Sequence, residues 1–325
     1  MLAMTARILL VALLVAFPAL AELKPLEKGK VPFKAVDDQK DVAERYRLEP
    51  REFEYQLKPQ RDLVVSGIEI YSLTFPSPVK TKYEENNTVH AEYFLPKGKG
   101  PFPGVIILDI LDGSQIVSRG IATVLATQGI AGLCVQMPYY GPRRPADGKV
   151  RLLSPDLPQS LEGIRQTVLD NRCAAAWLAS RPEIDAKKLG IHGTSLGSFM
   201  AALTAAAEPR LNKVSLLLGG GGLVDAYWDH PQAKQFLQVL AYWGGDKESL
   251  KKAIAPADPL TYADNLKKRN LLMIAASKDD IVPPSAAKAL WEATGKQKIV
   301  WLNATHVGAV FYLFDATEHI VKHFK

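Results

Sequence analysis

The sequence predicts an α/β fold in which a mostly parallel central sheet is covered by helices on both faces. Three observations predict it. From residue 104 onward, short apolar runs that suit strands buried on both faces alternate with segments that suit helices. Before them, two segments alternate apolar and polar residues, which is typical of antiparallel strands at an N-terminal edge. At residues 189–200, LGIHGTSLGSFM, a strand, a tight turn and a helix follow one another.

The N-terminus has the pattern of a secretory signal peptide. Arg7 precedes an apolar run at residues 8–17, and residues 19–21, ALA, match the small-x-small cleavage motif. The run is shorter than the roughly 20 apolar residues that a membrane span needs. We expect residues 1–21 to be a signal peptide, the protein to be exported (periplasmic or secreted), and no stable membrane span to remain after cleavage. An uncleaved N-terminal anchor is the alternative.

The composition excludes several function classes. The 325 residues carry a net charge of +6, but Lys and Arg are spread along the chain without a basic, aromatic-interleaved stripe, so nucleic acid is not an expected partner. The two cysteines, Cys134 and Cys173, form no CxxC motif, which excludes a disulfide framework and a cysteine metal cluster. Export would permit one disulfide between them. Their apolar surroundings favour two buried free thiols instead.

The first part of the mature chain lacks a clear pattern. Residues 22–61 are charged and punctuated by proline, and predict an N-terminal arm with at most one helix, at residues 37–48. We assign residues 62–325 to one domain. Within it, residues 63–75 and 88–95 predict the antiparallel strands, and the proline- and asparagine-containing stretch between them predicts a loop.

In the rest of the domain, predicted strands and helices alternate regularly. Six apolar runs predict the parallel strands, at residues 104–110, 130–137, 189–193, 214–218, 271–276 and 299–303. Segments of helical character predict helices at residues 118–128, 161–181, 198–207, 285–294 and 307–324.

The longest interruption follows the fourth parallel strand. A run of four glycines at residues 219–222 leads into a helical insertion at about 223–266, which contains the aromatic residues Tyr227, Trp228, Phe236, Tyr242 and Trp243. An insertion at the carboxyl edge of such a sheet lies where ligands bind, so the insertion is a candidate lid. Alternatively, its aromatic residues serve only to pack it against the domain.

The turn at residues 193–197, Gly-Thr-Ser-Leu-Gly, predicts a nucleophile. The pattern Gly-x-Ser-x-Gly between a strand and a helix is a nucleophile elbow, which projects the hydroxyl of Ser195 above the sheet. Glycine at both ends allows the strand and the helix to approach closely. A serine hydroxyl is a weak nucleophile, so it needs a base within hydrogen-bond reach and a group that orients the base.

Two later strand ends supply candidates for these partners, in the chain order serine, acid, histidine. The fifth parallel strand is followed by Asp279 and Asp280, and we favour Asp279 as the acid because Asp280 suits the turn before the prolines. Asp225, after the glycine run, is a distant third candidate. Of six histidines, His306 alone occupies a loop at a strand end downstream of the acid, so it is the expected base.

The remaining candidates concern the oxyanion and the substrate. The backbone N–H of Leu196, directly after the serine, is expected to bind the developing oxyanion, and Leu111 in the loop after the first parallel strand is our choice for the second donor. Arg143 and Arg144, in a Pro/Gly-rich loop after the second parallel strand, could bind an acidic part of a substrate. The alternative is a rigid loop whose arginines pair with surface acids.

These motifs resemble the α/β-hydrolase superfamily over residues 63–324. The resemblance rests on the elbow, on Asp279 with residues 281–284, IVPP, and on His306 with Gly308. The chain is similar to the dienelactone-hydrolase, acetyl-xylan-esterase and prolyl-oligopeptidase-like branches, in which a segment such as residues 258–262, DPLTY, precedes the acid. Related enzymes often carry His-Gly after the first strand, where this chain has Asp109-Ile110.

Together with the N-terminal pattern, the resemblance implies an exported serine hydrolase, most simply a carboxylesterase. Dienelactone hydrolases use a cysteine nucleophile, so serine at residue 195 favours an esterase. The expected substrate is a small-molecule, saccharide or lipid ester, cleaved through an acyl-enzyme without a metal or organic cofactor. A serine peptidase of the prolyl-oligopeptidase type and a non-catalytic binding protein on the same scaffold are the alternatives.

Overall fold

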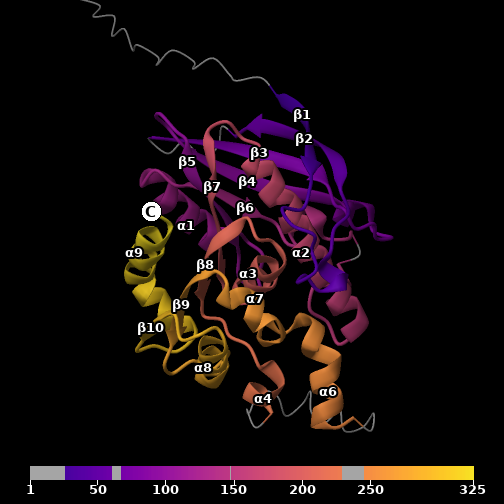
Figure 1. The fold of residues 1–325 in the computed structure, drawn as a ribbon, viewed down its shortest axis with the longest axis vertical. Helices are drawn as coiled ribbons and strands as arrows, with labels where there is room; N and C mark the ends of the chain where they lie inside the picture. The colour runs from indigo at the N-terminus through magenta and orange to yellow at the C-terminus, as the bar shows by residue number, and fades with distance from the viewer. Residues whose placement is uncertain (1–25, 61–66, 147, 229–244) are drawn as a thin grey trace, which may run out of the picture.

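The computed structural model describes residues 26–60, 67–146, 148–228 and 245–325. Within these ranges, ten strands form one sheet in the order β1-β2-β3-β4-β6-β5-β7-β8-β9-β10 (Figure 1). The predicted signal peptide lies outside the described residues, as do Phe236, Tyr242 and Trp243 of the insertion. None of the helices in the described ranges has both the length and the apolar character to cross a membrane.

The sheet has an antiparallel and a parallel part. Strands β1 to β4 pair antiparallel in sequence order, and β4 pairs antiparallel with β6. Strands β5 to β10 are parallel to one another, which confirms the predicted six parallel strands. The strands are β1 (Glu27–Phe33), β2 (Arg51–Pro59), β3 (Ile68–Pro76), β4 (Thr88–Pro96), β5 (Phe102–Leu108), β6 (Ala131–Val135), β7 (Ile184–Thr194), β8 (Leu211–Leu217), β9 (Asn270–Ala276) and β10 (Lys298–Leu302).

Helices cover both faces of this sheet, as predicted. Successive side chains of a strand point to opposite faces. In β5, Ile106 and Leu108 pack into the core beneath α2 and α3, whereas Val105 and Ile107 pack into the core beneath α1 and α9. The long helices are α1 (Ile116–Thr127), α2 (Leu157–Ala179), α3 (Leu196–Ala207), α8 (Pro284–Ala293) and α9 (Leu313–Phe324).

The shorter helices lie in loops and in the insertion. The described parts of the insertion are helical, and α4 and α6 lie at the end of the molecule opposite β1 and β2 (Figure 1). The short α-helices are α4 (Leu223–Tyr227), α6 (Lys247–Ile254) and α7 (Ala263–Lys267). The 3₁₀-helices are Glu44–Tyr46, Glu84–Asn87, Gly141–Arg143, Ala255–Ala257, Pro259–Tyr262 and Val307–Tyr312.

The N-terminal segment differs from the prediction. The helix expected at residues 37–48 is wrong, since only the 3₁₀ turn Glu44–Tyr46 forms there, and β1 and β2 extend the sheet on either side of it. The signal for β2 was present, because Phe53, Tyr55 and Leu57 alternate with polar residues. Only Phe53 and Leu57 of β2 are buried, so the apolar content of the strand is low and its pattern is easily overlooked.

The two cysteines lie in separate cores. Cys134 in β6 packs on the α1 and α9 side of the sheet, and Cys173 in α2 packs on the other side. Both are buried free thiols. Burial raises the pKa of the Cys173 thiol to about 12, because the apolar surroundings disfavour the thiolate. The free-thiol interpretation therefore holds over the disulfide.

A buried histidine in β7 links stability to pH. His192 is fully buried, with Nδ1 3.1 Å from Ser215 Oγ and Nε2 3.1 Å from Thr194 Oγ1. Burial, with a smaller effect of the neighbouring His323, lowers the pKa of His192 from 6.5 to about 3. The unfolded chain therefore binds a proton below about pH 6.5 that the folded chain does not bind, and stability falls as pH falls through that range.

We expect the titration of His192 to lower the free energy of unfolding by about 2 kcal/mol when the pH falls from 7 to 5. Urea denaturation at both pH values would measure the decrease, and His192→Gln should remove that part of it. His323, whose pKa burial lowers to about 4, would keep its own contribution in the variant. Equal decreases in the variant and the wild type would contradict the assignment to His192.

Candidate active site

Ser195 lies at the turn between β7 and α3, in a backbone conformation that is strained for a residue with a side chain. Its φ is 53° and its ψ is −118°. The flanking glycines are required by packing. A Cβ at Gly193 would lie 2.0 Å from the carbonyl oxygen of Gly197, and a Cβ at Gly197 would lie 2.3 Å from the carbonyl oxygen of Leu108. The turn has the geometry of a nucleophile elbow, with its serine at the carboxyl end of a central strand.

This packing gives a stability prediction. Gly197→Ala is expected to lower the free energy of unfolding by about 3 kcal/mol or more, because the new methyl group meets main-chain atoms that cannot move independently. Gly120→Ala is the matched control. A Cβ at Gly120 in α1 meets nothing within 4 Å, so alanine there should stabilise the helix by about 0.5–1 kcal/mol. Urea titration of both variants measures the difference, and equal effects would refute the packing argument.

Three side chains form a hydrogen-bonded line from this turn. Ser195 Oγ lies 2.9 Å from His306 Nε2. His306 Nδ1 lies 2.9 Å and 2.8 Å from the two carboxylate oxygens of Asp279. His306 and Asp279 have side chains only 10% and 3% exposed, so both are shielded from competing water. The structure therefore brings together the serine, the histidine and the acid that the sequence singled out.

The loop after β9 explains which aspartate faces the histidine. The Asp279 carboxylate accepts hydrogen bonds from the backbone N–H groups of Ile281 and Val282, at 2.9 and 2.7 Å, which fix its orientation. The Asp280 carboxylate instead accepts the backbone N–H of His306, at 3.2 Å. This contact, which the sequence analysis missed, ties the two loops together.

Asp225, the third candidate for the acid, does not face the histidine. Its carboxylate lies 2.8 Å from Lys247 Nζ and 2.9 Å from Lys251 Nζ, and its side chain is 55% exposed. These lysines lower the pKa of the Asp225 carboxyl. Asp225 therefore links α4 to α6 within the insertion.

The two oxyanion candidates lie at the start of α3 and in the loop after β5. Leu196 is the first residue of α3, where backbone N–H groups have no partner within the helix and the helix dipole favours negative charge. Leu111 lines the cavity that Ser195 and His306 also line, in the loop at residues 109–115. The carboxylate of Asp109 holds this loop by accepting the N–H groups of Gln115 and Ser118, at 2.5 and 3.1 Å. The departure from His-Gly at this position thus has a structural purpose.

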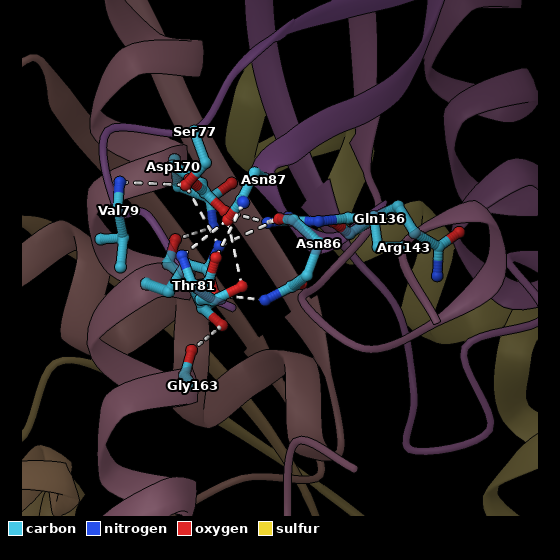
Figure 2. A network of polar contacts seen from close by, with 12 residues as sticks. Ser77, Val79, Thr81, Asn86, Asn87, Gln136, Arg143, Gly163 and Asp170 are labelled. Atoms are coloured by element: carbon cyan, nitrogen blue, oxygen red, sulfur yellow. Dashed lines mark hydrogen bonds and ion pairs between the residues drawn. The ribbon is translucent and has the colours of Figure 1, made fainter. Parts of the chain in front are cut away.

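The structure does not bring either candidate arginine to this cavity. Arg143 is fully buried, and its guanidinium donates to the carboxylate of Asp170 at 2.7 Å and to the carbonyl oxygens of Asn86 and Gln136 at 2.9 Å (Figure 2). It joins the loop after β6 to α2 and to the 3₁₀-helix before β4. With no exposed surface, Arg143 cannot bind a substrate, which contradicts that prediction.

Arg144 is exposed beside the backbone of Gly148, and it does not line the cavity. Arg143 does not fit the alternative of pairing with surface acids, because its partner Asp170 is itself buried. The network continues to the 109–115 loop, since the Gln136 amide donates to the carbonyl oxygen of Gly113 at 3.1 Å. Arg143 therefore supports that loop indirectly.

A cavity of about 520 Å³ opens beside Ser195 and His306. Its walls come from the 109–117 segment, the end of β8 and residues 307–316. The insertion approaches the same rim, because the hydroxyl of Tyr227 in α4 donates to the carbonyl oxygen of Ile281, which also lines the cavity. This volume is within the range of cavities that hold small organic ligands.

Known proteins resemble this chain in sequence and in fold. Residues 164–307 match the prolyl oligopeptidase family, and the match includes Ser195, Asp279 and His306. An acyl-coenzyme A amino acid N-acyltransferase 1 of Mus musculus is 32% identical over 37% of this chain and 24% of its own length. An acyl-coenzyme A thioesterase 2, mitochondrial, of the same species is 32% identical over 36% of this chain and 24% of its own length.

Among solved structures, an acetyl xylan esterase from Paenibacillus sp. R4 is 18% identical, covers 82% of this chain and 88% of its own chain, and superposes with a TM-score of 0.67. The chain spans about a quarter of the length of the two curated relatives, whereas it spans most of this esterase. The sheet order, the elbow and these likenesses show that the chain has the α/β-hydrolase fold, and residues 164–307 resemble the prolyl oligopeptidase family.

Proposed function

We propose that this protein is a serine hydrolase that cleaves carboxylic esters. The observation that carries the proposal is the line of hydrogen bonds from Ser195 Oγ through His306 to Asp279. A nucleophile, a base and an orienting acid in this arrangement are the requirements for acyl transfer through serine. They meet at the wall of a cavity, where a substrate can reach the serine.

The mechanism follows from these positions. His306 Nε2 takes the proton of Ser195 Oγ as the oxygen attacks the ester carbonyl carbon, and Asp279 holds the Nδ1–H of the imidazolium that forms. The N–H groups of Leu196 and Leu111 stabilise the oxyanion of the tetrahedral intermediate. His306 then gives its proton to the leaving alkoxide, which releases the alcohol and leaves an acyl-enzyme. Water, deprotonated by His306, hydrolyses the acyl-enzyme and restores Ser195.

The comparisons support acyl chemistry without fixing the substrate. The names of the similar proteins include an esterase, a thioesterase and an N-acyltransferase. A peptidase is the second candidate, because the matched family is that of prolyl oligopeptidase. An ester is easier to cleave than an amide at the same site, because an alkoxide is a better leaving group than an amide anion. Activity on matched ester and amide substrates therefore separates the two candidate functions.

Labelling with a fluorophosphonate tests the proposal directly. The wild type should become labelled, and Ser195→Ala and His306→Ala should not. Labelled protein that cleaves p-nitrophenyl esters but not the corresponding p-nitroanilides would support an esterase, and the reverse would support a peptidase. An unlabelled, folded and inactive wild type would sink the hydrolase proposal and favour a binding protein on this scaffold.

We also propose that the protein is exported, on the N-terminal pattern alone. Expression in a bacterial host followed by N-terminal sequencing of the extracytoplasmic fraction tests this proposal. A mature N-terminus at Glu22 is expected. Recovery of the full chain in the cytoplasm would overturn it, and recovery of the full chain in the membrane fraction would favour the uncleaved anchor.

A further inference from the structure

The cavity beside Ser195 is apolar almost throughout. Its floor is Leu217 and Leu218 at the end of β8, and its side walls include Val117 and Val310. Apart from the two reacting side chains, the polar lining in the described residues consists of Thr194 and Asp112, and Asp112 is exposed. The walls thus offer little hydrogen bonding beyond the point where the ester is cleaved.

This lining selects between classes of ester. A sugar ring in the cavity would bury several hydroxyl groups without partners, which is costly. A charged acyl group would be buried against leucine and valine, which is more costly still. Binding of an uncharged hydrocarbon chain, in contrast, becomes more favourable with each methylene group that moves from water into the cavity.

We propose that the substrate is an ester with an apolar hydrocarbon chain, and that the chain lies between the 109–117 segment and residues 307–316. The proposal rests on the proposed function, since the chain is positioned relative to the Ser195 nucleophile. It narrows the substrate to lipid-like esters and excludes acetylated saccharides as preferred substrates.

Leu313 is placed to set the length of the chain. A second apolar groove of about 540 Å³ runs between α1 and α9, with Ile121, Phe314 and Val321 among its lining residues. Leu313, at the start of α9, lines both the cavity and this groove. A chain that extends from the cavity into this groove therefore passes the Leu313 side chain. We assign Leu313 as the residue that limits chain length.

A p-nitrophenyl ester series from acetate to palmitate, assayed below the micelle concentration, tests the proposal. In the wild type, kcat/KM is expected to rise about two- to fourfold per methylene until the cavity is filled, and then to level off or fall. Leu313→Ala should move the optimum to longer chains. Val117→Phe, which narrows the cavity, should move it to shorter chains. Trp301→Ala is the control, because this exposed apolar residue lines neither space and should leave the optimum unchanged.

The side of the ester that enters the cavity is tested by a matched series of alkyl acetates from ethyl to dodecyl. A rise in kcat/KM with length in either series supports the proposal, and the series that rises identifies the acyl or the alcohol chain. A flat or falling profile in both, or a higher kcat/KM on acetylated xylo-oligosaccharides, would overturn it. An unchanged optimum in both Leu313→Ala and Val117→Phe would overturn the assignment of these walls.

Fluorophosphonate labelling keeps this inference separate from the proposed function. If Ser195 is labelled and short esters are cleaved, but chain length has no effect, the apolar-chain proposal fails and the serine hydrolase stands. If Ser195→Ala is labelled as strongly as the wild type, the proposed function itself fails.

Discussion

Ser195→Ala is expected to lower kcat on p-nitrophenyl esters by about 10⁵- to 10⁶-fold while the protein remains folded. The loss follows from geometry, because Ser195 Oγ is the hydroxyl that lies 2.9 Å from His306 Nε2 and at the wall of the cavity. Without it, no acyl-enzyme can form. The variant should show no burst of p-nitrophenol and no fluorophosphonate label. Its urea midpoint should stay close to that of the wild type, because alanine keeps the Cβ of serine and the strained turn is therefore unchanged.

Ser198→Ala provides a matched control for this experiment. Ser198 lies three residues on in α3, and its hydroxyl donates to the carbonyl oxygen of Ser195 at 2.7 Å rather than to the histidine. That carbonyl also accepts the backbone N–H of Ser198, at 2.9 Å, so it keeps a partner in the variant. We expect kcat to change by less than about tenfold. If Ser195→Ala retained more than a few per cent of wild-type activity, another nucleophile would be responsible.

The features that local sequence determines were predicted from sequence. The elbow needs glycine at residues 193 and 197, because a Cβ at either position would collide with main-chain atoms. The Gly-x-Ser-x-Gly motif is therefore the direct consequence of close packing in this turn. The parallel strands are buried on both faces, and they therefore appear as continuous apolar runs. The placement of Asp279 and His306 at successive strand ends follows from the topology, because parallel strands carry their carboxyl ends to one edge.

The features that depend on distant partners were not predictable in this way. Arg143 resembles a surface arginine in a Pro/Gly-rich loop, and only the fold shows that Asp170 of α2 and the carbonyl oxygens of Asn86 and Gln136 enclose it. The apolar cavity is likewise assembled from segments that lie far apart in sequence, between residues 110 and 316. Whether the insertion acts as a lid stays a prediction, since part of it lies outside the described residues.

Asp279→Asn is expected to lower kcat by about 10⁴-fold. The carboxylate accepts the Nδ1–H of His306 and so keeps Nε2 free to take the serine proton. The backbone N–H groups of Ile281 and Val282 hold one oxygen of residue 279, which turns the asparagine NH₂ group toward Nδ1. Because that group donates a hydrogen bond, the imidazole would carry its proton on Nε2 and could no longer act as the base.

Asp280→Asn is the matched control, because the same substitution is made one residue away. Asp280 accepts the backbone N–H of His306 at 3.2 Å, and the asparagine amide oxygen can take over that hydrogen bond. We expect kcat to fall by less than about tenfold, and the rate of fluorophosphonate labelling to follow kcat in both variants. A larger loss in Asp280→Asn than in Asp279→Asn would mean that Asp280, not Asp279, orients the histidine during turnover. The geometry without substrate favours Asp279 as the orienting acid. Hydrogen bonds in an active site tighten or exchange partners when substrate binds, so the kinetic comparison of the two variants decides between the acids.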